Sequence, residues 1–285
     1  PKLRNPHAFA TLRPWVDVGS VGRLTFRSLE RHFQAQDLAT LTKPGVFFDF
    51  TRYRPTIYNI NGERQVTTPN VQVRYAYGPD ENDFVFLHLL EPHLHGEGFV
   101  QSVVKLLEHL GIVRYCLIGA MSDMVPHTKP ILVTGSATGQ ETLQTVRDLG
   151  IFASSYEGPT SITSLISQKI ASVGVETMGL MAHLPQYAQM DVDHVGRLRI
   201  LEILCSLYGL DMNLERVQTR ARQQHDEISA AMNRSPEVIT LVEQLEKQYD
   251  ERLKRMSEGR PDEDPELSPN VLDFLDQLGE QFSQN

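Results

Sequence analysis

Runs of apolar residues alternate along this chain with segments of helical periodicity. Three runs rich in β-branched residues end in a small polar turn and give way to a helix-like pattern, over residues 13–22, 83–97 and 113–123. This alternation is typical of the strands and helices of a parallel α/β sheet. Further apolar runs predict strands over residues 131–134, 151–155 and 175–184. We therefore expect an α/β domain built on a parallel sheet.

The helical segments between these runs carry clear stop signals. Glycine directly follows the predicted helices at positions 111, 150 and 209, where a left-handed residue commonly ends a helix. The predicted helices span residues 21–35, 99–110, 140–149, 161–173 and 193–208. Residues 45–78 differ, because they contain four short strand-like runs separated by proline, asparagine and glycine. The pair Asn61-Gly62 predicts a tight β-hairpin there.

Polar side chains occur where the first three strands are expected to end. Asp17, Glu91 and Asp123 hold these positions, and the carboxyl ends of parallel strands share the edge at which α/β sheets bind ligands. Nearby glycines leave room for a ligand to approach the backbone. The candidate ligand-binding residues are Asp17, Gly19, Ser20, Gly22, Glu91, His93, Asp123, His127, Glu157 and Glu176.

The strands disappear after residue 211. Two amphipathic stripes predict helices over residues 214–232 and 238–256, and their apolar faces are candidate surfaces for self-association. Residues 257–267 are acidic and rich in proline, which is typical of a linker, and Ser268-Pro269 can start a last amphipathic helix. That helix either packs on its own domain or docks on a partner. The predicted divisions are therefore an α/β domain (1–210), a helical extension (211–256) and a linker with a terminal helix (257–285).

The charge of the chain and its lack of long apolar runs disfavour some classes of function. The 285 residues carry 27 Lys and Arg against 36 Asp and Glu, a formal charge of -9, which disfavours binding to nucleic acid or anionic membranes. No uncharged apolar run approaches the roughly 20 residues that cross a bilayer. Cys116 and Cys205 lie far apart among apolar neighbours, so we expect reduced thiols and a cytoplasmic protein.

Catalytic motifs give little support for an enzyme. Ser20 and Ser136 do not lie in the G-x-S-x-G turn of serine hydrolases. The chain has no G-x-x-x-x-G-K-[ST] loop, and Gly19 with Gly22 is only half of a dinucleotide fingerprint, so no cofactor is expected.

The segment from Glu91 to Glu97 groups carboxylate and imidazole side chains at a predicted strand end. It also contains His93 and His95, and carboxylate with imidazole can bind zinc or relay protons. The alternative is a polar loop whose histidines bind backbone groups. Because no ligand spacing elsewhere supports it, we expect no metal site.

Five segments together resemble the PAC2 family, named after the second proteasome assembly chaperone. They span residues 16–22, 86–93, 114–138, 156–162 and 175–188, and the resemblance covers roughly residues 10–210 in order. It implies a three-layer α/β/α sandwich similar to the phosphorylase and nucleosidase fold, oligomeric assembly, and in some members a role in proteasome assembly. Archaeal members that engage proteasomes tend to end in a hydrophobic residue, tyrosine and one more residue. Residues 281–285 (QFSQN) do not match, which disfavours docking through that end.

Two functions from different classes follow. The first is a non-enzymatic assembly factor or scaffold that forms homo-oligomers, with a trimer favoured, and binds proteasome subunits or another protein. The alternative is a hydrolase or phosphorylase that acts on a small polar ligand such as a nucleoside. Acidic strand ends that converge in a closed cleft would favour the enzyme.

Overall fold

The computed structural model describes residues 1–154, 156–232 and 236–260. The chain forms two compact units. The first unit contains residues 1–16, 26–117 and 159–177, and the second contains residues 17–25, 118–158 and those from 178 onward. Helix α1 (Val21–His32) and strand β7 (Arg114–Asp123) each contribute residues to both units.

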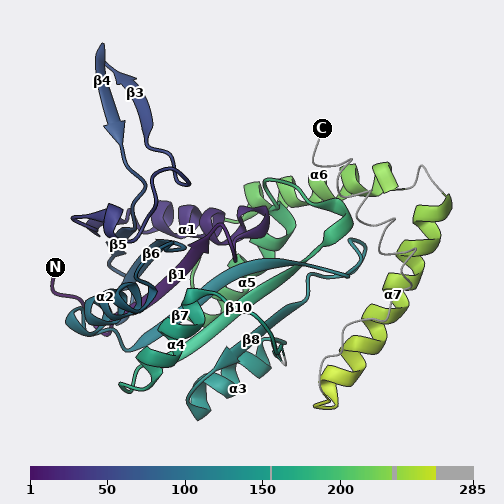
Figure 1. The fold of residues 1–285 in the computed structure, drawn as a ribbon. Coiled ribbons are helices and arrows are strands. Elements are labelled where there is room, and N and C mark those ends of the chain that lie inside the picture. The colour runs from purple at the N-terminus through teal and green to yellow at the C-terminus, as the bar shows by residue number, and fades with distance from the viewer. Residues whose placement is uncertain (155, 233–235, 261–285) are drawn as a thin grey trace. The chain divides into compact units, whose positions relative to one another are not determined.

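The first unit is built on a mixed sheet with the order β2-β5-β6-β1-β7. Its strands are β1 (His7–Arg13), β2 (Gln36–Thr40), β5 (Gln72–Ala76), β6 (Phe84–Leu90) and the first part of β7. Strand β1 is parallel to both β6 and β7, whereas β5 is antiparallel to both β6 and β2. Figure 1 shows β1 and β6 side by side in this sheet.

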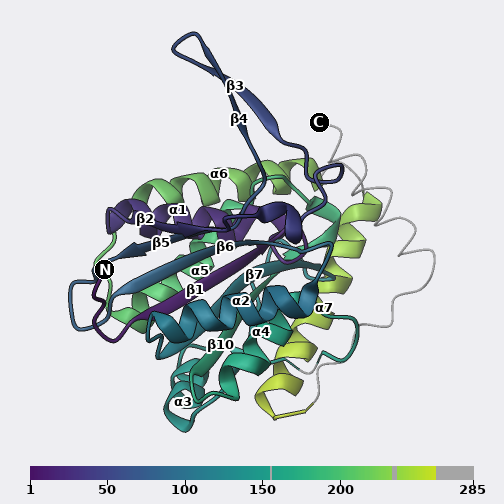
Figure 2. The same cartoon turned by 60° about the vertical axis from the view of Figure 1, so that its left-hand side comes forward.

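Helices cover both faces of that sheet. Ala8, Ala10 and Leu12 of β1 share a core with α2 (Gly96–His109) and α4 (Ile162–Ala171) on one face. On the other face, the Phe9 ring contacts the Phe86 ring, which also meets Phe26 of α1. Alternate residues of a strand point to opposite faces, so this short strand contributes to two cores at once. Figure 2 shows α2 and α4 in front of the strands.

A separate two-stranded ribbon leaves the first unit between β2 and β5. Strands β3 (Thr56–Ile60) and β4 (Glu63–Thr67) pair antiparallel, and Asn61 and Gly62 form the turn with φ of 52° and 86°. Positive φ at both central residues is the reason for the Asn-Gly pair. Figures 1 and 2 both show this β3–β4 hairpin standing away from the other strands, and it confirms the sequence prediction.

The second unit combines strands with the long helices. The later part of β7 belongs to it, together with β8 (Val133–Ala137), β9 (Phe152–Ala153) and most of β10 (Glu176–Pro185), in the order β7-β10-β8-β9. Strand β8 is antiparallel to β10 and parallel to β9. Its helices are α3 (Gln140–Asp148), α5 (His194–Tyr208), α6 (Glu215–Met232) and α7 (Pro236–Ser257).

The apolar faces of α6 and α7 pack into a buried cluster within the second unit. Leu245 of α7 is fully buried, and its cluster includes Tyr187 and Ile228. Because these faces pack against their own chain, the expectation that they form surfaces for self-association is wrong. The last predicted helix lies outside the described residues.

Several predicted elements differ from those observed. The first strand begins at His7 rather than Arg13, so Asp17 lies in an isolated bridge to Ala120 beyond the strand end. Residues 47–50 follow a short 3-10 helix, Pro44–Val46, instead of forming a strand, and β2 was not predicted. The parallel sheet is wrong in part, since β5 and β8 run antiparallel to their partners β6 and β10. In the part of the chain that the structure describes, none of the helices combines the length and apolar character needed to span a membrane.

Two glycines on adjacent strands give a matched test of packing between β8 and β10. A Cβ at Gly135 would lie 2.2 Å from the carbonyl oxygen of Gly179, whereas the nearest atom to a Cβ at Gly179 is the Ser136 hydroxyl oxygen, at 3.2 Å. We predict that Gly135→Ala lowers the free energy of unfolding by about 1–3 kcal/mol, because the strands must move apart. Gly179→Ala should change it much less. Urea denaturation measures both, and equal effects would contradict the observed close approach.

Candidate functional site

The Asp17 side chain caps the first turn of helix α1. Its carboxylate accepts hydrogen bonds from the backbone N–H of Gly22 at 2.7 Å and of Arg23 at 3.2 Å. These N–H groups have no partner within a helix, and a carboxylate stabilises them by charge as well as by hydrogen bonding. The side chain is nearly buried, with 9% of its surface exposed. The amide groups that could face an external anion therefore face Asp17.

Gly19 and Ser20, in the loop between Asp17 and α1, form hydrogen bonds with the segment before α5. The carbonyl oxygen of Gly19 accepts a hydrogen bond from Asp193 N at 2.8 Å, and Ser20 Oγ donates to the carbonyl oxygen of Asp191 at 2.9 Å. A Cβ at Gly19 would lie 2.5 Å from the Cβ of Asp193, and its φ of 57° disfavours other residues. Glycine at this position is thus explained by close packing within the second unit.

Glu91 and His93 come together at the end of β6 in the first unit. The Glu91 carboxyl accepts a hydrogen bond from Ile162 N, at the start of α4, at 3.4 Å. His93 Nδ1 accepts one from Asp49 N at 3.2 Å, and its ring lies 4.4 Å from the Tyr53 ring, centroid to centroid. The Tyr53 hydroxyl donates to the carbonyl oxygen of Glu91 at 3.2 Å. A carboxyl, an imidazole and a phenol therefore share one corner, which we call the Glu91 cluster.

The Glu91 carboxyl is only partly satisfied. Among the described residues, its Oε2 atom is buried and makes no hydrogen bond. Burial raises the pKa of Glu91, and the hydrogen bond from Ile162 N only partly offsets this effect. Such a carboxyl can exchange a proton or receive a donor from a ligand.

Asp123 ends β7 and lies at the centre of a buried polar network in the second unit. Its Oδ2 atom accepts hydrogen bonds from His183 Nδ1 and Arg252 Nη1, both at 2.6 Å. Burial by itself would raise the pKa of Asp123, but the hydrogen bonds and positive charge of these partners outweigh it and lower the pKa to about 2. Asp123 is therefore a charged anchor that holds α7 to the end of a strand.

The network continues from His183 to a hydroxyl group. Thr134 Oγ1 lies 2.7 Å from His183 Nε2, so hydroxyl, imidazole and carboxylate follow one another as in the relay of a serine hydrolase. Thr134 and His183 are each only 4% exposed, and Arg252 occupies the same Asp123 oxygen as the imidazole. A substrate cannot reach this hydroxyl in the observed arrangement, so the network is structural.

His127 is buried beside Tyr187 in the second unit. The Tyr187 hydroxyl lies 2.7 Å from His127 Nδ1 and accepts a hydrogen bond from His127 N at 2.8 Å. Burial, assisted by the nearby His225, lowers the pKa of His127 to about 4. The imidazole is therefore neutral at neutral pH and unsuited to hold an anion.

The two remaining candidates differ in their surroundings. Glu157 is exposed in the loop before α4. Glu176, the first residue of β10, pairs with Arg114 at 2.8 Å in the first unit. Glu91, His93 and Glu176 thus belong to the first unit, whereas Asp17, Gly19, Ser20, Gly22, Asp123, His127 and Glu157 belong to the second. A common acidic edge formed by Asp17, Glu91 and Asp123 stays a prediction.

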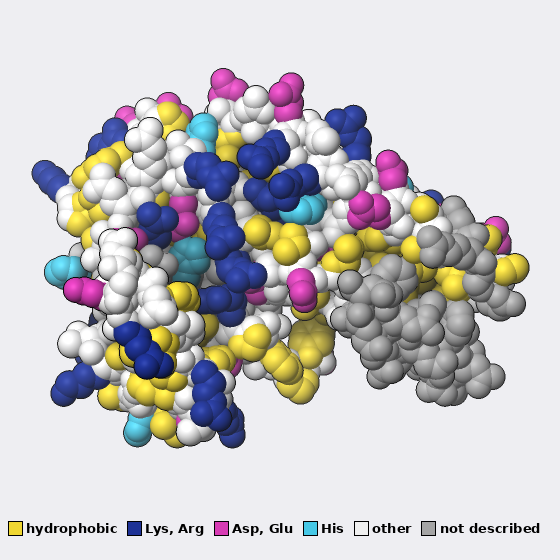
Figure 3. Space-filling view, turned by 90° about the horizontal axis from the view of Figure 1, so that it is seen from above, with side chains coloured by type: hydrophobic (Ala, Val, Ile, Leu, Met, Phe, Trp, Pro, Cys, Tyr) yellow, Lys and Arg dark blue, Asp and Glu magenta, His cyan; other side chains and the backbone are white. Residues whose placement is uncertain are grey.

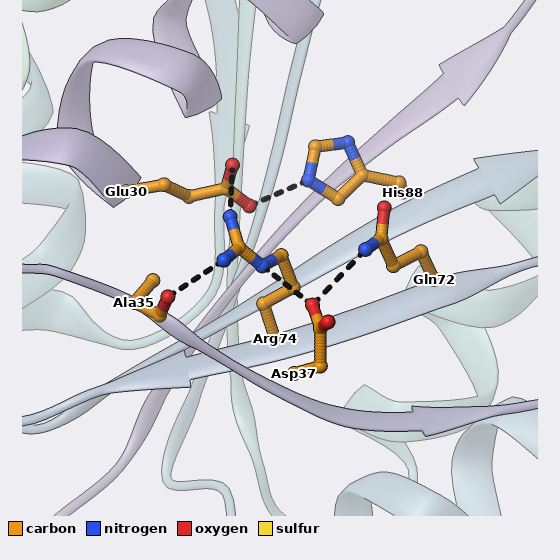
Figure 4. A network of polar contacts seen from close by, with 6 residues as sticks. All are labelled: Glu30, Ala35, Asp37, Gln72, Arg74 and His88. Atoms are coloured by element: carbon orange, nitrogen blue, oxygen red, sulfur yellow. Dashed lines mark hydrogen bonds and ion pairs between the residues drawn. The ribbon is translucent and has the colours of Figure 1, made fainter. Parts of the chain in front are cut away.

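Two histidines on strands, the part-buried His88 and the buried His183, were missed by the sequence reasoning. His88 of β6 lies 2.6 Å from Glu30 of α1, and Arg74 of β5 binds Glu30 at 3.1 Å and Asp37 at 2.9 Å. Figure 4 shows these side chains pointing toward one another between the helix and the strands. His88 and His183 each interrupt an apolar strand run, FVFLHLL and MGLMAHLP, and that interruption was the available signal. Within the described residues, no group of three or more His, Cys, Asp or Glu has the arrangement of a metal site.

The sequence profile of the PAC2 family matches residues 11–232. The chain belongs to the PAC2 family. Solved structures share the fold: a PAC2 family protein from Streptomyces avermitilis is 24% identical, with a TM-score of 0.74 over 83% of this chain and 99% of that one. A proteasome-assembly chaperone homologue from Mycobacterium tuberculosis is 20% identical, with a TM-score of 0.73 and the same two coverages.

A structure of lower sequence identity that shares the fold is PbaB from Pyrococcus furiosus, described as an archaeal proteasome activator. It is 14% identical, with a TM-score of 0.61 over 81% of this chain and 95% of that one. No curated protein matches the sequence significantly. The comparisons establish the family and an α/β fold with a mixed central sheet.

Asp123→Asn should reduce the stability of this PAC2 protein at neutral pH. It removes the carboxylate that pairs with the buried Arg252 guanidinium, and breaking such a buried ion pair costs about 3–5 kcal/mol. The folded pKa of about 2 lies below the ordinary value of 3.8, so the wild-type contribution is complete above about pH 4 and lost toward pH 2. Urea denaturation between pH 2 and 7 measures this dependence. Asp250→Asn, at an exposed carboxylate paired with Lys129, is the control and should have little effect. Equal losses in both variants would contradict the assignment.

Glu91→Gln should raise the stability at neutral pH, in contrast to Asp123→Asn. Because burial raises the folded pKa of Glu91, the wild-type protein loses stability as the pH rises through that pKa. The variant should therefore unfold at a higher urea concentration than the wild type at pH 7, but not at pH 4. Glu97→Gln removes an exposed carboxylate from the first turn of α2 and should instead lower the midpoint slightly. A lower midpoint for Glu91→Gln at pH 7 would show that the carboxylate is stabilising.

Proposed function

We propose that this PAC2 protein is a non-enzymatic assembly factor that binds other proteins during the formation of a larger complex. The observation that carries this proposal is the family match over residues 11–232. Structural relatives are described as a proteasome-assembly chaperone homologue and an archaeal proteasome activator, which makes proteasome subunits the favoured partners.

The chemistry of the described side chains supports a binding role. Asp17 accepts hydrogen bonds from the first amides of α1, and Asp123 forms an ion pair with Arg252. The Thr134–His183 pair is buried where no substrate reaches it. Polar groups committed to such contacts stabilise the fold but are not available for proton transfer to a substrate. Most of the candidate carboxylates and imidazoles are thus accounted for without a reaction.

A homo-oligomer, with a trimer favoured, remains part of the proposal. It follows from the family resemblance, and the faces of α6 and α7 do not support it because they are buried in their own unit. We also propose the three-layer sandwich of the phosphorylase and nucleosidase kind, which the helices on both faces of the first unit support. The free thiols of Cys116 and Cys205 support a reducing, cytoplasmic location.

The Glu91 cluster favours a second candidate function, binding of a small polar ligand. Glu91 Oε2 is buried and makes no hydrogen bond to another described residue. The Tyr53 hydroxyl donates to the backbone carbonyl of Glu91, and the Tyr53 ring contacts that of His93. A ligand with a hydroxyl or amine group, such as a nucleoside, has the hydrogen-bond donor that this oxygen lacks. The hydrolase or phosphorylase alternative therefore rests on this corner of the first unit.

Reconstitution with proteasome subunits tests the proposed function. Purified α- and β-type subunits from the same organism are mixed with and without the full chain, and particle formation is followed by native electrophoresis and light scattering. We expect a complex with free subunits and faster formation of complete particles. A control protein of similar size and net charge should have no effect. No complex at about 10 µM and an unchanged rate of assembly would overturn the proposal, and base release from nucleosides would favour the enzyme.

A further inference from the structure

The β3–β4 hairpin has an apolar strand edge that no other strand covers. Every residue from Thr56 to Thr67 is exposed. Large apolar side chains are frequent in β3, and their exposed fractions are 50% for Ile57, 49% for Tyr58 and 47% for Ile60. Within the described residues the hairpin sheet contains only β3 and β4, so the outer edge of β3 is open. An open edge that also exposes apolar side chains is a template for a further strand.

The composition of β3 differs from that of another edge strand in the same unit. Strand β2, at one edge of the eight-stranded sheet, contains Asp37 and a register shift between Asp37 and Ala39. A charge and an irregular register both discourage pairing at an edge. Strand β3 pairs with β4 in continuous register and contains no charged residue, whereas β4 carries Glu63 and Arg64. The β3 edge is therefore the one best suited to pair.

The register of the hairpin determines which backbone groups of β3 are available. In a hairpin with a two-residue turn, the residues that flank the turn form a hydrogen-bonded pair, and such pairs alternate along the strands. Here the flanking pair is Ile60 with Glu63. The N–H and C=O groups of Ile57 and Asn59 therefore point away from β4, toward the open edge.

The sequence of β3 is complementary to itself. Two copies of β3 can run antiparallel with Tyr58 opposite Tyr58. Ile57 of each copy then lies opposite Asn59 of the other, so their outward N–H groups donate to each other's carbonyl oxygens. The two Tyr58 residues form the non-hydrogen-bonded pair between them, where opposite side chains approach most closely. Every outward backbone group of β3 finds a partner in this register.

Charge favours the same register. Arg54 lies just before β3, and Glu63 lies just after the turn at the far end of the hairpin. With Tyr58 on a two-fold axis, Arg54 of one copy lies opposite Gly62 of the other, next to Glu63 of that copy. The same attraction occurs twice because the axis repeats it. Figure 3 views the molecule from the side on which the hairpin projects, and basic and apolar side chains both reach the surface there.

We propose that β3 is a self-association surface, which pairs antiparallel with β3 of a second copy across a two-fold axis at Tyr58. The product is a four-stranded sheet in the order β4-β3-β3-β4, which is more stable than a hairpin alone. The proposal rests on the homo-oligomer included in the proposed function and names one of its surfaces. Because the contact is two-fold, it doubles the mass of the species that carries the hairpin, whether that species is a single chain or a trimer.

A charge placed on the axis tests the contact in the full chain. Tyr58→Lys puts two positive charges opposite each other, so we expect the dissociation constant for mass doubling to rise at least about tenfold. The matched control is Gln65→Lys, which adds the same charge opposite Tyr58 but on β4, and should change the constant less than about twofold. Light scattering between about 1 and 100 µM measures both.

The possible failures have different meanings. Equal effects of Tyr58→Lys and Gln65→Lys would overturn the proposed surface. A wild-type protein that stays trimeric at about 100 µM would overturn it too, but would leave the homo-oligomer intact. A wild-type protein that stays monomeric would overturn both. None of these measurements uses a proteasome subunit, so they are independent of the reconstitution experiment.

A charge exchange tests the register. Arg54→Glu and Glu63→Arg should each weaken the association about threefold, because each places like charges next to one another across the contact. The double variant, Arg54→Glu with Glu63→Arg, restores opposite charges and should return the dissociation constant to the wild-type value. A double variant as weak as the sum of the two single changes would overturn this register.

A disulfide between two chains tests the position of the axis. Opposite residues of a non-hydrogen-bonded antiparallel pair have Cα atoms about 4.5 Å apart, a separation that a disulfide can span. Mild oxidation of Tyr58→Cys should therefore link two chains, as measured by non-reducing electrophoresis. Gln65→Cys and the wild type, with its two native thiols, should remain unlinked. Equal linking of Tyr58→Cys and Gln65→Cys would overturn the pairing through β3.

Discussion

Strand β1 has no side that faces water, and much of the first unit depends on this constraint. Its neighbours β6 and β7 both run parallel to it, and its two faces meet different helices. Ala8 and Ala10 are small, which lets α2 and α4 approach one face, while Phe9 fills the space toward α1 on the other. A strand buried on both faces reads as a continuous apolar run instead of an alternating one. Seven residues, His7–Arg13, are thus sufficient for the centre of the sheet.

Burial on both faces also determines how polar groups are used. Polar atoms removed from water need partners, so the histidines of β6 and β10 are found in hydrogen-bonded networks. His88 pairs with Glu30 in the first unit, and His183 bridges Thr134 and Asp123 in the second. These networks connect helices to strands across long stretches of sequence. These networks resemble active sites because buried polar side chains need hydrogen-bond partners whether their role is catalytic or structural.

Exposed apolar surfaces and unsatisfied polar atoms are therefore more informative about function than the hydrogen-bonded networks. Within the described residues, the β3–β4 hairpin places four apolar side chains in solvent, and the Glu91 cluster retains a carboxyl oxygen without a hydrogen bond. Protein binding needs an accessible surface, whereas a reaction needs an accessible polar group. A PAC2 protein that acts by binding others requires only the first of these.

The sequence by itself determined the features that depend on local interactions. Gly111 and Gly209 end α2 and α5 with φ of 68° and 59°, and Asn61-Gly62 forms its turn, because these conformations are set by the residues themselves. The family resemblance likewise came from short ordered segments. The tertiary structure alone decided that β5 runs antiparallel to β6, that the buried run His7–Arg13 is a strand, and that Asp123 binds Arg252. Asp123 and Arg252 lie 129 residues apart, and no local pattern specifies which distant partner a buried polar group will find.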